Sequence, residues 1–95
     1  MSIHYIVHDP DDSVGVIVVP DGIKAGAVLV GWNMATDATL AATALDDIPV
    51  GHKLALRPHA VGEGIIKYGH DIGKVVEPIS TGGHVHTQNV KTRRW

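Results

Sequence analysis

Two short motifs in this sequence place histidines directly after glycines. They are Gly51-His52-Lys53 and Gly83-His84-Val85-His86. His84 and His86 are two positions apart, so in an extended segment both imidazoles point to the same face and can converge on one metal ion. A solvated strand face is the alternative interpretation of this pair. His52 follows a turn glycine, which presents its side chain at a rim, and we predict a catalytic role for it.

The absence of cysteine limits the metal chemistry open to the chain. Histidine, aspartate, glutamate and amide groups are the only protein ligands left, and they admit iron(II), manganese, magnesium or zinc. We predict His84 and His86 as metal ligands and His86 also as a catalytic residue. Thr87 and Asn89 follow His86 and can hold a ligating ring or a substrate hydroxyl in place, so Asn89 is a predicted substrate-binding residue.

Further groups could bind an anionic substrate or transfer protons. Lys53 could meet a carboxylate, and a solvated lysine is the alternative. Lys67 and Tyr68 could offer a cation and a phenol, and the alternative for Tyr68 is a packed ring with a hydrated hydroxyl. Asp46 and Asp47 could form a carboxylate pair for acid and base work, but beside Ile-Pro they are better explained as turn formers.

The charge balance excludes several classes of partner. The formal net charge is -2 and the isoelectric point is near 6.3, so the chain lacks the general basic field on which nucleic-acid binding rests. Its first residues, Met1 to Ile6, form neither a basic leader nor an apolar run long enough for export, and no later segment approaches membrane length. We therefore expect a cytoplasmic protein that binds neither nucleic acid nor membranes.

The elements that position the histidines are predicted to be short strands joined by tight glycine turns. Three times an aliphatic residue is followed three positions later by glycine, at Ile23/Gly26, Ile48/Gly51 and Ile79/Gly82. Glycine supplies the positive φ that such turns need. The core must be built from Val, Ile, Leu and Ala, which suits pleated strands. We expect residues 1–95 to form one compact, mostly β domain.

The individual strands follow from apolar runs between turn residues. Ile3–Val7 and Val14–Val19 are predicted as an antiparallel pair. The stretch Ala35–Leu45 has helix-favouring composition but alternates as a strand does, and we interpret it as a strand. Gly69 and Gly73 are predicted to bracket a turn. Four further strands are expected, at Val28–Val30, Leu54–Leu56, Ile65–Tyr68 and Val75–Val76.

Three segments closely resemble one family. Asp46–Leu56, Ile66–Gly73 and His84–Thr92 are similar, in order and spacing, to the amino-terminal domain of altronate and galactarate dehydratases. The resemblance extends over essentially the whole chain and implies the SAF-type β-clip fold. It also implies that a separate large catalytic subunit is the partner, as in split sugar-acid dehydratases and sulfolactate sulfo-lyase.

Two positions depart from the family pattern. His59 stands where a fourth copy of the turn, ending at Gly62, usually has an aliphatic residue, so His59 is a poor site candidate. Gln88 stands where many relatives have a third histidine of this loop.

The implied reaction is the elimination of water or bisulfite from a 2-hydroxy acid. It requires removal of a proton near the carboxylate, stabilisation of enolate-like charge and assistance to the departing group. A divalent metal, iron(II) or manganese, would answer the second need and histidines the others. Because the chain offers no full ligand set, we expect it to complete a site that it shares with the large subunit.

Functions from different classes stay open on sequence alone. The first is the small subunit of a lyase that acts on altronate, galactarate or (R)-sulfolactate, with His52 and His86 in catalysis and Lys53, Lys67 and Asn89 against the substrate. The second is a noncatalytic sugar-acid binding or docking module. The third is an oligomerisation domain, since the isolated chain could form a homo-oligomer.

Overall fold

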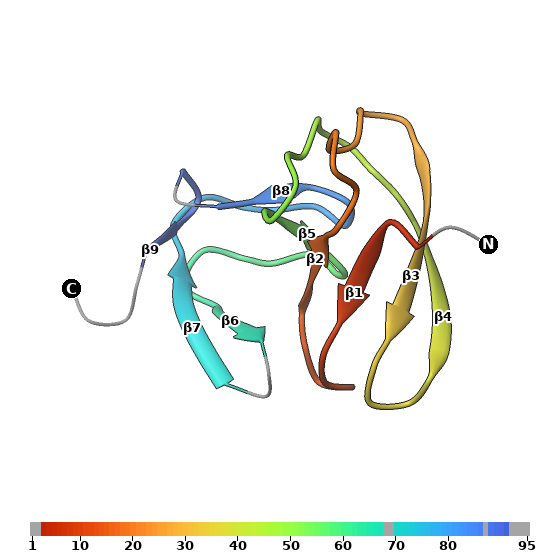
Figure 1. Ribbon diagram of the computed structural model, residues 1–95. Helices are drawn as coiled ribbons and strands as arrows, with labels where there is room; N and C mark the ends of the chain where they lie inside the picture. The colour runs from red at the N-terminus through yellow and green to blue at the C-terminus, as the bar shows by residue number, and fades with distance from the viewer. Residues whose placement is uncertain (1–2, 68–69, 87, 92–95) are drawn as a thin grey trace.

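The regular secondary structure of the chain is entirely β in the computed structural model, which describes residues 3–67, 70–86 and 88–91 (Figure 1). The predicted mostly β fold with short strands is thereby confirmed. No helix that could cross a membrane occurs in the described part of the chain. The strands are β1 (Tyr5–Val7), β2 (Val14–Ile17), β3 (Val28–Asn33), β4 (Ala38–Thr43), β5 (Lys53–Ala55), β6 (Gly64–Lys67), β7 (His70–Val75), β8 (His84–Val85) and β9 (Val90–Lys91).

The strands form two sheets. The larger has the order β4-β3-β1-β2-β5-β8, and the smaller has the order β6-β7-β9. Strands β1 and β3 run parallel, whereas the other neighbours are antiparallel. Figure 1 shows the smaller sheet on the left, with β5 and β8 of the larger sheet between it and the first four strands. Strands β5 and β8, which contain residues of the two glycine-histidine motifs, therefore lie near the middle of the molecule.

Most of the predicted strands are confirmed, including the one with helix-favouring composition at Ala35–Leu45. Residues Ala38–Thr43 form β4, which pairs with β3 over six consecutive residues. The predicted turn is wrong at Gly73, which lies inside β7, and Gly69 lies outside the described residues. A Cβ on Gly73 would lie only 2.5 Å from Val90 Cγ1. This glycine therefore allows β9 to approach β7, and the close approach explains its presence.

The repeated turns bring their first residues together in pairs. The residue three positions before each glycine forms a backbone bridge, Ile23 with Ile48 and His59 with Ile79. His59 is only 2% exposed, so it belongs to the core and not to a surface site. The predicted positive φ is confirmed at the turn glycines, with values of 89° at Gly26, 83° at Gly51, 94° at Gly62 and 86° at Gly82.

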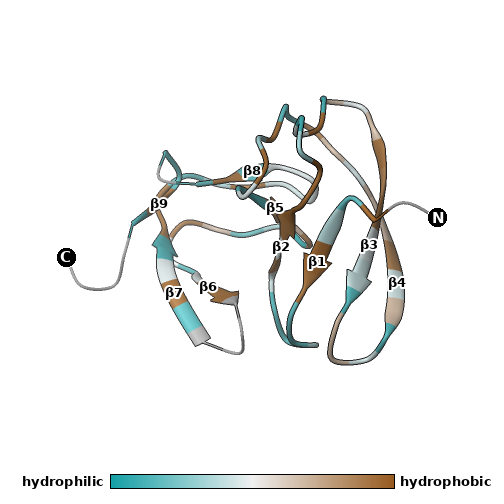
Figure 2. Ribbon diagram, in the orientation of Figure 1, coloured by the Kyte–Doolittle hydropathy of each residue, from teal (hydrophilic) through white to brown (hydrophobic). Residues whose placement is uncertain are grey.

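The core is divided between two groups of buried side chains. Figure 2 shows hydrophobic segments on β1 and β2, in the middle of the larger sheet. The Tyr5 ring of β1 is buried and lies over two glycines, Gly15 and Gly31, on the neighbouring strands. One group comprises Tyr5, Val7, Ile17, Ile23, Leu29, Ala44, Ile48 and Leu54, and the other comprises Val14, Ala55, Ile65, Val75, Ile79 and Val85.

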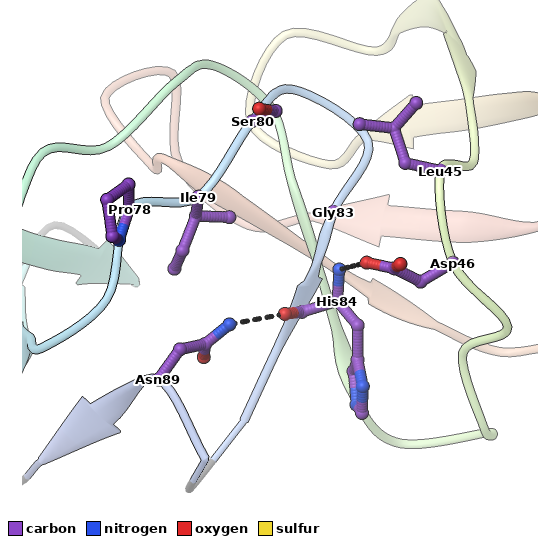
Figure 3. A pocket seen from close by; sticks show the side chains of 8 residues that line it. All are labelled: Leu45, Asp46, Pro78, Ile79, Ser80, Gly83, His84 and Asn89. Carbon is purple, nitrogen blue, oxygen red and sulfur yellow. Dashed lines mark hydrogen bonds between the residues drawn. The ribbon is translucent and has the colours of Figure 1, made fainter.

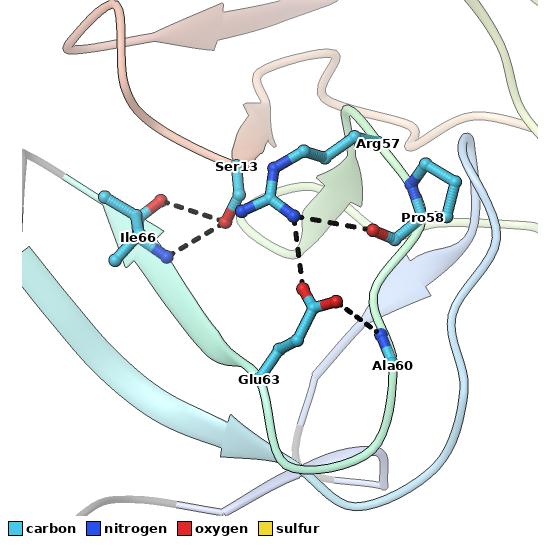
Figure 4. A network of polar contacts seen from close by, with 6 residues as sticks. All are labelled: Ser13, Arg57, Pro58, Ala60, Glu63 and Ile66. Atoms are coloured by element: carbon cyan, nitrogen blue, oxygen red, sulfur yellow. Dashed lines mark hydrogen bonds and ion pairs between the residues drawn. The ribbon is translucent and has the colours of Figure 1, made fainter.

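Polar contacts tie the smaller sheet to the segment before β2 and close one of the turns (Figure 4). Buried Ser13, just before β2, accepts the Ile66 N–H through Oγ at 2.9 Å, and its own backbone N–H donates to the Ile66 carbonyl at 2.9 Å. Glu63 accepts hydrogen bonds from Arg57 and from the Ala60 N–H, each at 3.1 Å. These contacts fix the turn that carries His59.

Candidate functional site

Pairing of β5 with β8 brings the two glycine-histidine motifs together. Lys53 lies opposite Val85 and Leu54 opposite His84 in this antiparallel pair. His52 immediately precedes β5, and His84 is the first residue of β8. The register therefore places two histidines that are 32 positions apart in the sequence side by side.

Three imidazoles gather at this point. His52 Nδ1 lies 2.8 Å from His84 Nε2, within hydrogen-bonding distance. The His86 ring stacks on the His52 ring, with 3.7 Å between centroids and 17° between planes. The centroids of His84 and His86 are 5.9 Å apart, and their planes are within 9° of parallel. The predicted proximity of His84 and His86 is therefore present, and His52 lies in the same cluster.

A glutamine side chain determines the direction of the hydrogen bond between His52 and His84. Gln88 Nε2 lies 3.2 Å from His84 Nδ1. An amide nitrogen can only donate, so His84 Nδ1 is the acceptor and the neutral ring carries its proton on Nε2. That proton is donated to His52 Nδ1, which leaves the neutral His52 ring with its proton on Nε2. The assigned tautomers thus follow from the orientation of the Gln88 amide.

The environment keeps two of the three rings uncharged near neutral pH. Burial lowers the pKa of His84 below its ordinary value of 6.5, and the charges of His52 and His86 lower it further, while Asp46 opposes them. The pKa of His86 is also lowered, first by desolvation and then by the charges of His52 and Lys53. A neutral imidazole can accept a proton from a substrate, so His86 is suited to act as a base. Both ring nitrogens of His84 already have hydrogen-bond partners.

The loop that carries His84 and His86 is held by the Asn89 side chain. Asn89 Nδ2 donates to the His84 carbonyl at 2.7 Å, and Asn89 Oδ1 accepts the His86 N–H at 3.0 Å. The residue is only 8% exposed. Both ends of its amide thus bind the backbone of the histidine loop, which gives Asn89 a positioning contact in addition to the substrate contact predicted from the sequence.

A cavity of about 250 Å³ adjoins this loop (Figure 3). Asp46 and Asn89 bind the His84 backbone from either side, and the His84 ring points away from Leu45 and Ser80. The cavity is lined by Leu45, Asp46, Pro78, Ile79, Ser80, Gly83, His84 and Asn89.

The three rings as they stand do not form a metal site. Nitrogen lone pairs lie in the ring plane, so nearly parallel rings cannot direct three of them to one point, as a tetrahedral ion needs. Across residues 3–67, 70–86 and 88–91, no group of three or more histidine, aspartate or glutamate side chains could hold a metal ion. The predicted metal ligands His84 and His86 are close, but the described residues do not complete their ligand set.

The remaining predicted residues are placed unequally. Lys53 begins β5 beside the cluster, and its charge acts on His86. Lys67 ends β6 in the smaller sheet, and its side chain and Tyr68 lie outside the described residues. Neither Gln88 nor Asp46 was among the site residues predicted from the sequence, where Asp46 was interpreted as a turn former. The spacing of Gln88, four residues after His84, could have suggested its contact, whereas nothing local indicates that Asp46 reaches across 38 positions to His84.

Comparison with known proteins identifies similar chains. The (2R)-sulfolactate sulfo-lyase subunit alpha of Chromohalobacter salexigens is 56% identical over 95 residues, which is the full length of both chains. The subunit of the same name from Paracoccus pantotrophus is 57% identical over 53 residues, 56% of this chain and 79% of that protein. The altronate dehydratase of Bacillus subtilis is 47% identical over 47 residues, half of this chain but 10% of that enzyme.

The family model described as the altronate/galactarate dehydratase SAF domain matches residues 3–93. This match covers all three segments on which the resemblance was based, so that prediction is confirmed. The chain therefore belongs to the altronate/galactarate dehydratase SAF domain family.

Proposed function

We propose that this chain is the small subunit of a two-component lyase that eliminates bisulfite or water from a 2-hydroxy acid, with (2R)-sulfolactate as the preferred substrate. The observation that carries the proposal is the cluster of His52, His84 and His86 beside Lys53. The full-length similarity to a sulfo-lyase subunit alpha supports the substrate, and the word subunit in that name supports a partner chain. Altronate and galactarate are the alternative substrates.

In the proposed reaction, His86 removes the proton from the carbon that bears the hydroxyl and carboxylate groups. A carbon-carbon double bond forms, the carbon-sulfur bond breaks, and its electron pair leaves with sulfite. The resulting enol becomes a 2-oxo acid. Lowering of its pKa keeps His86 neutral and ready to accept the proton. Elimination of water from a sugar acid would follow the same course with hydroxide as the departing group.

His52 and Lys53 assist at the two ends of the substrate. The hydrogen bond from His84 leaves a proton on His52 Nε2, which can be donated to the departing group. Lys53 offers a cation to the carboxylate or sulfonate. Lys67 and Asn89 are the other two residues proposed to bind the substrate. For Asn89 this contact would be additional to its hydrogen bonds with the histidine loop.

A divalent metal, iron(II) or manganese, stays a prediction for the assembled enzyme. The large subunit would have to supply further ligands, because the three stacked rings do not suffice. No step above depends on the metal. The cytoplasmic location and a homo-oligomer of the isolated chain are likewise predictions.

Mixing experiments test the proposed function. The chain is assayed alone and with the large subunit encoded nearest to it, against (R)-sulfolactate, altronate and galactarate with added iron(II) or manganese. We expect turnover only in the mixture, fastest with (R)-sulfolactate. A stable complex that turns over none of the acids would instead support the docking module.

A His86→Ala substitution separates catalysis from docking. We expect a loss of turnover of about 100-fold or more with assembly retained, because general acid-base groups contribute factors of this size. His8→Ala, the same change at the residue directly after β1, outside the histidine cluster, serves as the control. Unchanged turnover in the His86 variant would refute the catalytic role.

A further inference from the structure

The backbone N–H of His84 is hydrogen-bonded by a side chain instead of a neighbouring strand. β8 is the outermost strand of the larger sheet. The Gly83 carbonyl faces β5 and accepts the Ala55 N–H at 2.9 Å. In a trans peptide the next N–H points the opposite way, so the His84 N–H faces away from β5. Asp46 Oδ2 accepts this N–H at 2.9 Å (Figure 3).

The segment that carries Asp46 is held beside β8 by its own backbone. The Leu45 N–H donates to the Gly82 carbonyl at 2.9 Å, one residue before Asp46 reaches His84. A Cβ on Gly82 would clash with the Thr43 carbonyl oxygen, so this approach requires glycine. Residues 43–46 thus take the place that a further strand would occupy, and the Asp46 carboxylate extends the contact to the histidine.

We propose that Asp46 is a positioning residue that holds the His84 backbone so that its imidazole meets His52 and Gln88. We call the hydrogen-bonded chain from Gln88 through His84 to His52 the relay. This inference rests on the proposed function, because it names the residue that orients the relay in the proposed active site. Asp46 touches neither the His52 ring nor the His86 ring through any hydrogen bond among the described residues. It acts through His84, and a shift of that backbone by about 1 Å is enough to lower a catalytic rate by about 100-fold.

The neighbouring residue Asp47 provides a matched control. Asp47 Oδ1 also accepts a backbone N–H, that of Ala25, at 2.9 Å, and Oδ2 lies 3.6 Å from Lys24 Nζ. Asp46 and Asp47 are both exposed. Removing either carboxylate therefore deletes one charge and one bond to the backbone from the same loop, but only Asp46 binds the histidine loop.

The first test measures the kinetics of the complete two-subunit complex. We expect Asp46→Ala to lower kcat by about 10-fold to 100-fold while KM changes little, because orientation and not substrate binding is lost. Asp46→Asn should retain most of the activity, since its amide oxygen can accept the same N–H. Asp47→Ala should leave kcat unchanged. Equal loss in the Asp46→Ala and Asp47→Ala variants would overturn the proposal.

The second test does not depend on turnover. Hydrogen exchange of the His84 amide and the NMR signals of the His52 and His84 rings are measured in the full chain. We expect Asp46→Ala to accelerate this exchange and to shift both ring signals, unlike Asp47→Ala. An unchanged His84 amide would overturn the proposal. If these changes appear but the wild-type complex turns over none of the acids, the positioning role stands and the proposed function fails.

Discussion

His52 and His84 form a direct contact between imidazoles, with 2.8 Å between His52 Nδ1 and His84 Nε2. The two residues come from segments that precede β5 and begin β8, and Gln88 binds the far nitrogen of His84. Three hydrogen-bonded side chains thus follow one another, Gln88, His84 and His52, and His86 stacks on the last of them. This arrangement gives each ring nitrogen of His84 a partner.

Replacing Gln88 with methionine tests this arrangement. Methionine preserves length but removes the amide that donates to His84 Nδ1, so the two tautomers of His84 become closer in energy. We expect kcat to fall by roughly 10-fold, as for other groups that orient a site residue. Nitrogen-15 NMR of the His84 ring should show a mixed tautomer in place of the Nε2–H form. An unchanged tautomer and kcat would contradict the assigned relay.

Lys53→Met should weaken binding of the anionic substrate more than it slows the chemistry. The lysine charge is the group beside the cluster that can attract a carboxylate or sulfonate, so we expect KM to rise by about 10-fold with a smaller change in kcat. Loss of this charge also removes one of the causes that lower the pKa of His86. The pH at which the variant loses activity on the acid side should therefore move upward.

Lys24→Met is the control for the lysine variant. Lys24 is highly exposed and pairs with Asp47 instead of the histidines. The Lys24→Met substitution removes the same charge as Lys53→Met. An equal rise in KM would therefore indicate a general effect of net charge and refute direct substrate binding by Lys53.

Gly31→Ala should destabilise the fold through one contact. A Cβ at Gly31 would overlap the buried Tyr5 ring. Overpacking of this kind costs about 1–3 kcal/mol in free energy of unfolding, measurable by urea denaturation. In the background Tyr5→Leu the same substitution should cost less, because the ring is gone. A cost that is identical in both backgrounds would exclude the ring as the cause.

His59→Ile should stabilise the protein, and more so in acid. Both ring nitrogens of His59 are buried and make no hydrogen bond to the described part of the chain, a situation that costs about 1–3 kcal/mol. Isoleucine occupies the equivalent position in the three other turns.

The pH dependence of this stabilisation follows from the pKa of His59. Burial, and then the charge of Arg57, lower it below 6.5, while Glu63 opposes them. The unfolded chain therefore binds a proton that the folded chain rejects, and stability contributed by the neutral ring is lost as pH falls below about 6.5. We expect a larger gain from His59→Ile at pH 5 than at pH 8 in urea denaturation. Equal gains at both pH values would show that His59 titrates normally.

The strands show which local patterns can be interpreted reliably. The stretch Ala35–Leu45 was interpreted as a strand because its alternation outweighed the helical propensity of alanine and leucine. The pairing of Ala38–Thr43 with β3 confirms this interpretation. The two-residue strands β8 and β9 have no periodicity to detect. Gly73 was misinterpreted because a glycine that permits close strand approach has the same letter as one that forms a turn.

The sequence by itself determined the class of fold, the positive φ of the turn glycines and the types of ligand atom that a site on this chain could offer. The positive φ of a turn glycine three positions after an aliphatic residue has a local cause, because glycine lacks a Cβ. A chain without cysteine can offer a metal only nitrogen and oxygen ligands. The motifs around His52 and His84 also identified the family. Only the tertiary structure decided that His52 joins His84 and His86 and that Asp46 holds the His84 backbone. The first contact depends on the register between β5 and β8, and the second on the approach of residues 43–46 to Gly82. Both are set by packing of residues far apart in the sequence and not by local propensity.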